Sequence, residues 1–115
     1  MHEMSLAGNI LQLVEEAAVR ERFCRVAALR IEAGRLAGVE TRALRFALDA
    51  LAPGTCLEGA KINIDERVAI GWCADCEQQI EIEARALPCP LCGGFQIEAT
   101  SGSELRVVDM LVQDN

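Results

Sequence analysis

The sequences Cys73-Ala-Asp-Cys76 and Cys89-Pro-Leu-Cys92 are two Cys-x-x-Cys motifs separated by twelve residues. Each motif is a tight turn that brings two sulfur atoms close enough to bind one ion. Together the two turns offer four thiolates, which is the tetrahedral ligand set of closed structural zinc sites. Pro90 stiffens the second turn, and the two glycines after it allow backbone N–H groups to approach the sulfurs. We therefore predict that Cys73, Cys76, Cys89 and Cys92 hold a structural Zn²⁺.

The same four sulfurs leave two alternatives open. They could be four reduced thiols without a metal, although four cysteines seldom reach this double spacing by accident. They could also hold iron, as in a rubredoxin. Iron sites of that kind usually lie among aromatic side chains, and aromatic residues make up only 3% of this sequence. A colourless purified protein with one zinc per chain would exclude the iron site.

The rest of the chain alternates between helical and strand periodicity. In chain order we predict helices over residues 5–22 and 39–51, and strands over residues 24–33, 60–70, 78–84, 95–99 and 105–112. Ser5 is the expected N-cap of the first helix, and Pro53-Gly54 ends the second. The last strand is apolar on both faces, so we expect it to lie at the centre of the sheet.

These elements predict an α+β fold in which the cysteine motifs form an insertion. Two helices pack on a small three-stranded mixed sheet, and strands from both sides of the insertion share that sheet. The α+β domain comprises residues 1–70 and 100–115, and a zinc-ribbon-like module comprises residues 71–99. At 115 residues the chain has room for one compact domain and a small metal-stabilised one.

The charge balance argues against two common classes of partner. The formal net charge is −7, and four thiolates around one Zn²⁺ would add −4 + 2 = −2. Nucleic acids and anionic membranes both favour a basic face, so we expect neither as a partner. No apolar run approaches the roughly 18 residues that span a membrane, and no secretory signal is present. We expect a cytoplasmic protein, in which cysteines are more often metal ligands than disulfides.

Residue patterns for catalysis are missing from the sequence. His2 is the only histidine, and no Gly-x-x-x-x-Gly-Lys-Ser/Thr phosphate loop is present. The carboxylates fall on the polar faces of predicted helices and strands, where solvation is their ordinary role. Cys24 and Cys56 have no companion at ligand spacing, so we interpret both as partly buried free thiols. We do not expect an enzyme.

Met1-His2-Glu3 at the start of the chain has the chemistry of a metal chelate. The terminal amine and the His2 amide nitrogen would close a five-membered ring on a metal, and the amide and imidazole Nδ1 would close a six-membered ring. Glu3 adds another amide nitrogen or a carboxylate oxygen. Such nitrogen-rich sites suit Ni(II) or Cu(II). The alternative is that His2 is a solvated, mobile residue near a terminus.

The sequence resembles the HypA/HybF family of nickel-insertion accessory proteins for [NiFe] hydrogenase. The resemblance rests on the Met-His-Glu-x-Ser/Thr-Leu start (Met1–Leu6), the stretch from Gly34 to Glu40, and the pair of Cys-x-x-Cys motifs. It extends over essentially the whole chain. Some zinc sites in this family use a histidine near the motifs. No such histidine is present here, so the zinc site should be all-sulfur.

The resemblance implies a nickel metallochaperone with structural zinc. Nickel would be bound by Met1, His2 and Glu3, with Glu40 as an added ligand or supporting group, and residues 1–70 and 100–115 would form the nickel-binding domain. Zinc would be held by the four motif cysteines. A separate HypB-type GTPase and the large subunit of a [NiFe] hydrogenase would be the partners, and the chain would be a monomer or a homodimer. The alternative function is a zinc-ribbon protein-interaction module that does not deliver nickel.

Overall fold

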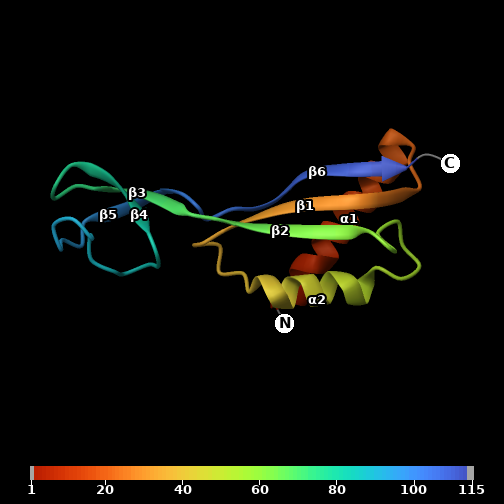
Figure 1. Ribbon diagram of the computed structural model, residues 1–115, viewed down its shortest axis with the longest axis horizontal. Helices are drawn as coiled ribbons and strands as arrows, with labels where there is room; N and C mark the ends of the chain where they lie inside the picture. The colour runs from red at the N-terminus through yellow and green to blue at the C-terminus, as the bar shows by residue number, and fades with distance from the viewer. Residues whose placement is uncertain (1, 114–115) are drawn as a thin grey trace. The chain divides into compact units, whose positions relative to one another are not determined.

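The computed structural model describes residues 2–113 and contains two helices and six strands in that range (Figure 1). The elements are, in chain order, α1 (His2–Glu21), β1 (Arg25–Gly34), α2 (Thr41–Leu51), β2 (Lys61–Arg67), β3 (Ala69–Cys73), β4 (Gln78–Ile82), β5 (Ile97–Ser101) and β6 (Leu105–Gln113). The strands form two separate three-stranded sheets, with the order β2-β1-β6 in one and β4-β3-β5 in the other. The predicted α+β class is confirmed. No helix in the described part of the chain is long and apolar enough to cross a membrane.

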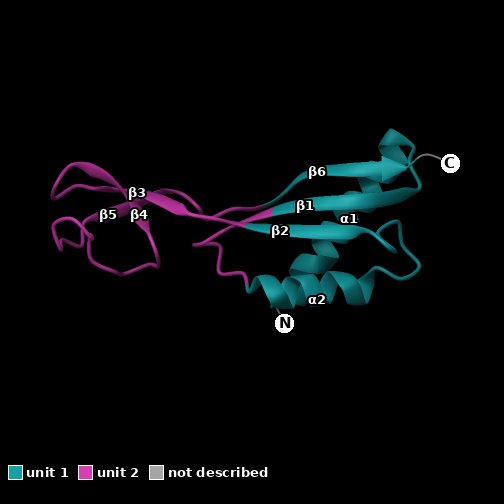
Figure 2. Ribbon diagram, in the orientation of Figure 1, with its two compact units in different colours: residues 1–31, 40–65, 106–115 teal, residues 32–39, 66–105 magenta. Residues whose placement is uncertain are grey.

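The chain divides into two compact units (Figure 2). Unit 1 comprises residues 1–31, 40–65 and 106–115, and unit 2 comprises residues 32–39 and 66–105. These boundaries differ from the divisions at 70/71 and 99/100 that the sequence suggests. β3 and β5, which flank the cysteine motifs, both pair within the second sheet and so extend unit 2 in both directions. Residues 32–39 also belong to unit 2, and Leu36 from this segment packs against its core.

Unit 1 buries the apolar faces of α1, α2 and β1 against one another. Leu29, Ile31 and Ala33 of β1 are almost completely buried, as period-2 alternation predicts for a strand with one covered face, and Val26 near the start of the strand is buried as well. The largest fully buried side chains of this unit are aliphatic: Val14, Val26, Leu29, Ile31, Leu44, Leu48 and Leu57. The predicted helix over 39–51 is observed as α2, with its final turn capped at Ala52. The strands that share the sheet, β2 and β6, come from the two sides of the insertion, as predicted.

Helix α1 begins at His2, three residues before the start predicted from Ser5. Ser5 is therefore an exposed residue within the helix and is not its N-cap. Two features of Glu3 explain the earlier start. Its acidic side chain in the first turn interacts favourably with the positive end of the helix dipole. It also accepts a hydrogen bond from the backbone of Glu40, which fixes the first turn against the beginning of α2.

The strand predicted over residues 60–70 is two strands in two different sheets. β2 ends at Arg67 and β3 begins at Ala69, and the intervening Val68 is 46% exposed. In the sequence, the large apolar residues keep to even positions across the break, from Ile62 to Ile70. The buried residues of β3 are instead the odd-numbered Ala69, Gly71 and Cys73. Sequence periodicity alone therefore cannot distinguish one long strand from two short ones.

The last strand, β6, lies at an edge of its sheet, so the predicted central position is wrong. The sheet order β2-β1-β6 gives the central position to β1. β6 is apolar on both sides, yet Leu111 and Val112 near its end are 66% and 39% exposed. A run of apolar residues predicts burial on both faces, whereas in β6 it accompanies partial exposure.

Unit 2 is built on an antiparallel sheet with β3 at its centre. The register pairs Gly71 with Ile80 on β4 and with Ala99 on β5. The predicted strand that leads away from the first cysteine motif is confirmed as β4. The buried core of this unit consists of Ala69, Cys73, Ile80, Ile82 and Cys89, with the partly buried Leu36, Cys76, Ile97 and Ala99 packed against it. Two of the motif cysteines are thus part of the core itself.

Candidate metal centres

The four motif cysteines converge at one end of the sheet in unit 2. Cys73 is the last residue of β3, Cys76 follows in the turn to β4, and Cys89 and Cys92 lie in the loop between β4 and β5. Their ligand atoms all lie within 4.8 Å of one another. The Cys73 and Cys92 sulfurs are 3.7 Å apart, and the Cys76 and Cys89 sulfurs are 3.8 Å apart. A tetrahedral ion with metal–sulfur bonds of about 2.3 Å needs sulfurs about 3.8 Å apart, so the four thiols fit Zn²⁺.

Backbone N–H groups point at two of these sulfurs. Leu91 N–H donates to the Cys89 Sγ, and Gly94 N–H donates to the Cys92 Sγ, both at 3.4 Å. The predicted role of the glycines after the second motif is thus observed for Gly94. The adjacent Gly93 has a φ of +76°, a conformation that glycine adopts without strain.

The sulfurs influence one another's proton affinity. Burial would raise the pKa of the Cys89 thiol, but the N–H groups of Cys92 and Leu91 outweigh it and lower the pKa to about 7. Burial and the three neighbouring thiols raise the pKa of Cys76 to about 12. Without a cation, therefore, the four thiols do not all ionise near neutral pH, and a bound divalent ion would supply the missing positive charge.

Cys24 and Cys56 lie in unit 1 and do not belong to the four-sulfur cluster. Both are free thiols; Cys56 is buried, whereas Cys24 is exposed and so differs from the predicted partial burial. Burial, followed by the charge of Glu15, raises the pKa of Cys56. The Cys24 thiol contacts the carbonyl oxygen of Gln113 at 3.7 Å. We find no arrangement of further ligands around either thiol within the described residues.

The second candidate site lies where the two helices of unit 1 begin. His2 and Glu3 occupy the first turn of α1, and Glu40 immediately precedes α2. His2 Nδ1 is 3.7 Å from Glu3 Oε2, and the Glu40 N–H donates to the same oxygen at 3.2 Å. The structure therefore brings together three of the predicted nickel ligands. The fourth, Met1, lies outside the described residues.

The hydrogen bond from the Glu40 N–H favours the ionised form of the Glu3 side chain. Its side chain is only 17% exposed, whereas that of His2 is 61% exposed. The hydrogen bond from the Glu40 backbone is the main reason that the pKa of Glu3 lies below its ordinary value, and the adjacent His2 adds to the effect. A carboxylate has about four lone-pair positions, so Glu3 keeps acceptor capacity for a metal after binding one N–H.

Glu40 caps the second helix with its own side chain. Its backbone is extended, with φ −83° and ψ 106°, and its Oε1 accepts the Arg42 N–H at 2.9 Å. Ser, Thr, Asp and Asn are the usual residues at this position, so a glutamate is an uncommon cap. The Glu40 residue remains exposed.

The helical start also makes amide nitrogens available. The first four N–H groups of an α-helix have no carbonyl partner within the helix. Because α1 begins at His2, the amides of His2 and Glu3 belong to this group. Coordination through either nitrogen would therefore not break a helical hydrogen bond.

The family resemblance implies that Glu3 and Glu40 lie near one nickel ion, but the residue pattern alone does not predict the hydrogen bond between them. Leu13 lies at helical spacing from Ile10 and Ala17, but its side chain is 58% exposed. The buried stripe contains Ala7, Ile10, Val14 and Ala17. Its spacing of three and four residues extends back to Glu3. This extension is the signal that could have shown Glu3 to face α2.

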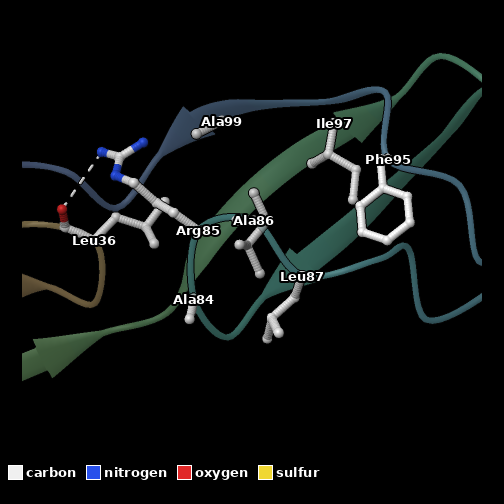
Figure 3. A pocket seen from close by; sticks show the side chains of 9 residues that line it. Leu36, Ala84, Arg85, Ala86, Leu87, Phe95, Ile97 and Ala99 are labelled. Atoms are coloured by element: carbon white, nitrogen blue, oxygen red, sulfur yellow. Dashed lines mark hydrogen bonds between the residues drawn. The ribbon is translucent and has the colours of Figure 1, made fainter.

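Unit 2 also contains an apolar cavity of about 240 Å³ (Figure 3). The side chains of Leu87 and Phe95 lie toward one end, while Arg85 at the other end reaches the carbonyl oxygen of Leu36. Arg85 is its one ionisable lining residue, so the cavity has no set of groups for metal binding or acid–base chemistry.

Comparisons with known proteins agree on one family. The family model described as "Hydrogenase/urease nickel incorporation, metallochaperone, hypA" matches residues 1–112. The hydrogenase maturation factor HypA of Cupriavidus necator is 59% identical over 115 residues, covering 100% of this chain and 97% of that protein. The protein of the same name from Polaromonas naphthalenivorans is 56% identical over 114 residues, covering 99% of each chain.

The fold is similar to solved structures as well. The solution structure of the nickel metallochaperone HypA from Helicobacter pylori superposes with a TM-score of 0.69 and covers 98% of each chain. Its sequence identity to this chain is only 17%, so this comparison bears on the fold alone.

Proposed function

Because the chain belongs to the HypA family of nickel-incorporation metallochaperones, we propose that it binds Ni(II) at its N-terminus and helps to insert it into [NiFe] hydrogenase. The nickel is cargo, and it is held by Met1, His2 and Glu3. Glu40 acts as an additional ligand or as the group that positions Glu3. The protein works in the cytoplasm, as a monomer or a homodimer, with a HypB-type GTPase and the hydrogenase large subunit as partners.

The observation that supports this proposal is the meeting of His2, Glu3 and Glu40 where two helices begin. Helix N-termini repel cations, so a cation site there needs compensating negative charge. The two carboxylates supply that charge. Together with an imidazole and amides that have no helical partner, they provide the mixed nitrogen and oxygen donors that Ni(II) accepts.

We propose that Cys73, Cys76, Cys89 and Cys92 hold a structural Zn²⁺. A bound zinc would cross-link the end of β3 to the loop before β5 and would neutralise part of the thiolate charge. All four ligands are sulfur, and the described residues include no histidine near them, so zinc should be retained under conditions that release nickel.

The nickel site is tested by titrating untagged, zinc-loaded protein with Ni(II), following heat and the d–d absorption. We expect His2→Ala to weaken nickel binding by more than about tenfold, as loss of groups around a metal commonly does. An extra glycine before Met1 should have a similar effect, because it removes the terminal amine from the chelate.

Protons compete with Ni(II) for the same nitrogens, so the affinity for nickel should fall as the pH falls. Zinc content, measured by elemental analysis, should stay at one per chain in both variants.

Glu21→Gln is the matched control, because it removes a carboxylate from the opposite end of α1. It should leave nickel binding unchanged. If His2→Ala and the extended protein bind nickel as the parent does, the N-terminal site is wrong. If the parent binds no nickel at all, the alternative of a zinc-ribbon interaction module is favoured.

A further inference from the structure

The sheet of unit 2 has one covered face and one open face. Ala69, Gly71 and Cys73 point toward the cysteine core and are buried. The residues between them, Ile70 and Trp72, belong to the opposite face. Trp72 is the only tryptophan of the chain, and it is 45% exposed.

Exposed polar residues surround Trp72 on this open face. The register places Trp72 opposite Gln79 on β4 and opposite Glu98 on β5. The adjacent Ile70 lies opposite Glu81 on β4. Residues that are directly opposite in an antiparallel pair lie on the same face, so Glu98 and Glu81 share the open face with the indole. We refer to Trp72, Glu81 and Glu98 as the Trp72 face.

Neither carboxylate of the Trp72 face has a cation partner among the described residues. Unit 2 contains eight carboxylates and only three arginines. All three arginines are engaged elsewhere: Arg35 pairs with Glu66 and Glu83, Arg67 pairs with Glu32, and Arg85 contacts the Leu36 carbonyl. The face therefore combines a half-exposed indole with two carboxylates whose charge is not neutralised from within this unit.

We propose that the Trp72 face binds a basic segment of a partner protein, with an arginine or lysine side chain stacked on Trp72 and paired with Glu98 and Glu81. An indole face attracts a cation, and adjacent carboxylates strengthen that attraction by direct pairing. Tryptophan is also among the residues most enriched at the energetic centres of protein interfaces. This docking role does not depend on the proposed nickel site.

The charges of unit 2 favour a basic polypeptide as the partner over a nucleic acid or a second copy of this chain. A phosphate backbone would be repelled by the two carboxylates, which argues against nucleic acid. The same face of a second copy would be equally acidic, because the three arginines of unit 2 are committed to the same internal contacts. A polypeptide with an exposed arginine or lysine can both pair with the carboxylates and stack its cation on the indole.

The test uses two synthetic peptides of equal length, one of alternating glycine and arginine and one of alternating glycine and glutamate. The full-length zinc-loaded protein is titrated with each peptide at low salt, and the fluorescence of Trp72 is recorded. We expect a saturable change with the arginine peptide, a weaker response when salt is added, and no change with the glutamate peptide. Equal responses to the two peptides would overturn the proposal.

Three glutamine variants separate local pairing from general acidity. Glu98→Gln and Glu81→Gln should each weaken binding of the arginine peptide by about threefold, in the range of exposed ion pairs. Glu104→Gln removes the same charge from unit 2 outside its sheet strands and should leave the affinity unchanged. A loss with Glu104→Gln as large as with Glu98→Gln would mean that only net charge attracts the peptide, which would contradict the proposal.

A tryptophan variant tests the indole directly. Trp72→Leu should weaken binding of a dye-labelled arginine peptide, measured by fluorescence anisotropy, while zinc content and nickel binding stay at the parent level. An unchanged affinity would overturn the role of Trp72. Light scattering of the protein alone gives the remaining outcome: self-association that Trp72→Leu abolishes would assign the face to a second copy and would contradict a basic partner.

Discussion

At the scale of single residues, Glu3 combines three roles in one side chain. It lies on the buried stripe of α1, it is an acid in the first turn of that helix, and it accepts the N–H of a residue 37 positions away. The hydrogen bond and the helix dipole favour the ionised form and outweigh partial burial, which disfavours it. The carboxylate is therefore fixed in place and charged before any metal arrives, which is how a chelating group is preorganised for binding.

The Glu3 contact predicts a specific dependence on pH. The folded protein lowers the pKa of Glu3, so it binds this proton less readily than the unfolded chain does. The stabilising contact is thus complete above the pKa of a glutamate in an unfolded chain, about 4.3, and is lost as the pH falls through the lower folded value. In an NMR titration, the amide proton of Glu40 should shift with a midpoint below that of an ordinary glutamate.

Glu3→Gln provides the control for this titration. The Glu40 amide should then show no transition at that midpoint, because a glutamine side chain does not ionise. The variant should also lose stability to urea near neutral pH, and the difference from the parent should shrink at pH values below the midpoint. A transition of the Glu40 amide that persists in Glu3→Gln would mean that another group titrates there.

At the scale of the elements, the close approach of two loops in unit 2 depends on glycine. Gly34, at the end of β1, lies directly against the backbone carbonyl of Gly102, and a side-chain carbon at position 34 would collide with it. The same region is joined by backbone hydrogen bonds of 2.8 Å from Gly34 to Glu104 and from Leu36 to Gly102. The backbone atoms therefore have little freedom to move aside.

We expect Gly34→Ala to destabilise the protein by about 1–3 kcal/mol, the range for added atoms in a packed site. Gly8→Ala is the matched control, because Gly8 lies within α1 and an added carbon meets nothing within 4 Å. That change should increase stability by about 0.5–1 kcal/mol through the higher helix propensity of alanine. Urea unfolding followed by circular dichroism measures both. Similar effects of the two substitutions would contradict the tight contact at Gly34.

The elements that the sequence predicted well are those whose buried face repeats at one clear period. Helix α2 and strands β1 and β4 belong to this group, and so does the convergence of the four cysteines, which depends on local turn spacing. Three features depended on tertiary contacts. The start of α1 follows from the Glu3–Glu40 hydrogen bond, the break at Val68 follows from pairing in two sheets, and the edge position of β6 follows from sheet order. The buried stripe of α1 extends back to Glu3, but neither its partner Glu40 nor the strand pairing in two sheets leaves a periodic pattern in the sequence.

At the scale of the whole molecule, the chain passes between the two units four times, at residues 31/32, 39/40, 65/66 and 105/106. The residues proposed to bind nickel belong to unit 1, and the cysteine cluster belongs to unit 2. Each unit has its own sheet and its own buried core. This arrangement predicts that the two metals act separately, so that loss of zinc should loosen one unit without removing the nickel ligands.

Zinc removal by a strong chelator tests this separation. The core of unit 2 includes Cys73 and Cys89, so repulsion between thiolates and loss of the cross-link should disrupt the core directly. We expect amide hydrogen exchange of residues 66–105 to become faster by at least about tenfold, while the amides of α1 and α2 exchange as before. Nickel binding measured on the same zinc-free sample should keep its dependence on His2. Faster exchange throughout α1 and α2, with loss of nickel binding, would instead show that the two units fold as one and that zinc supports the nickel site.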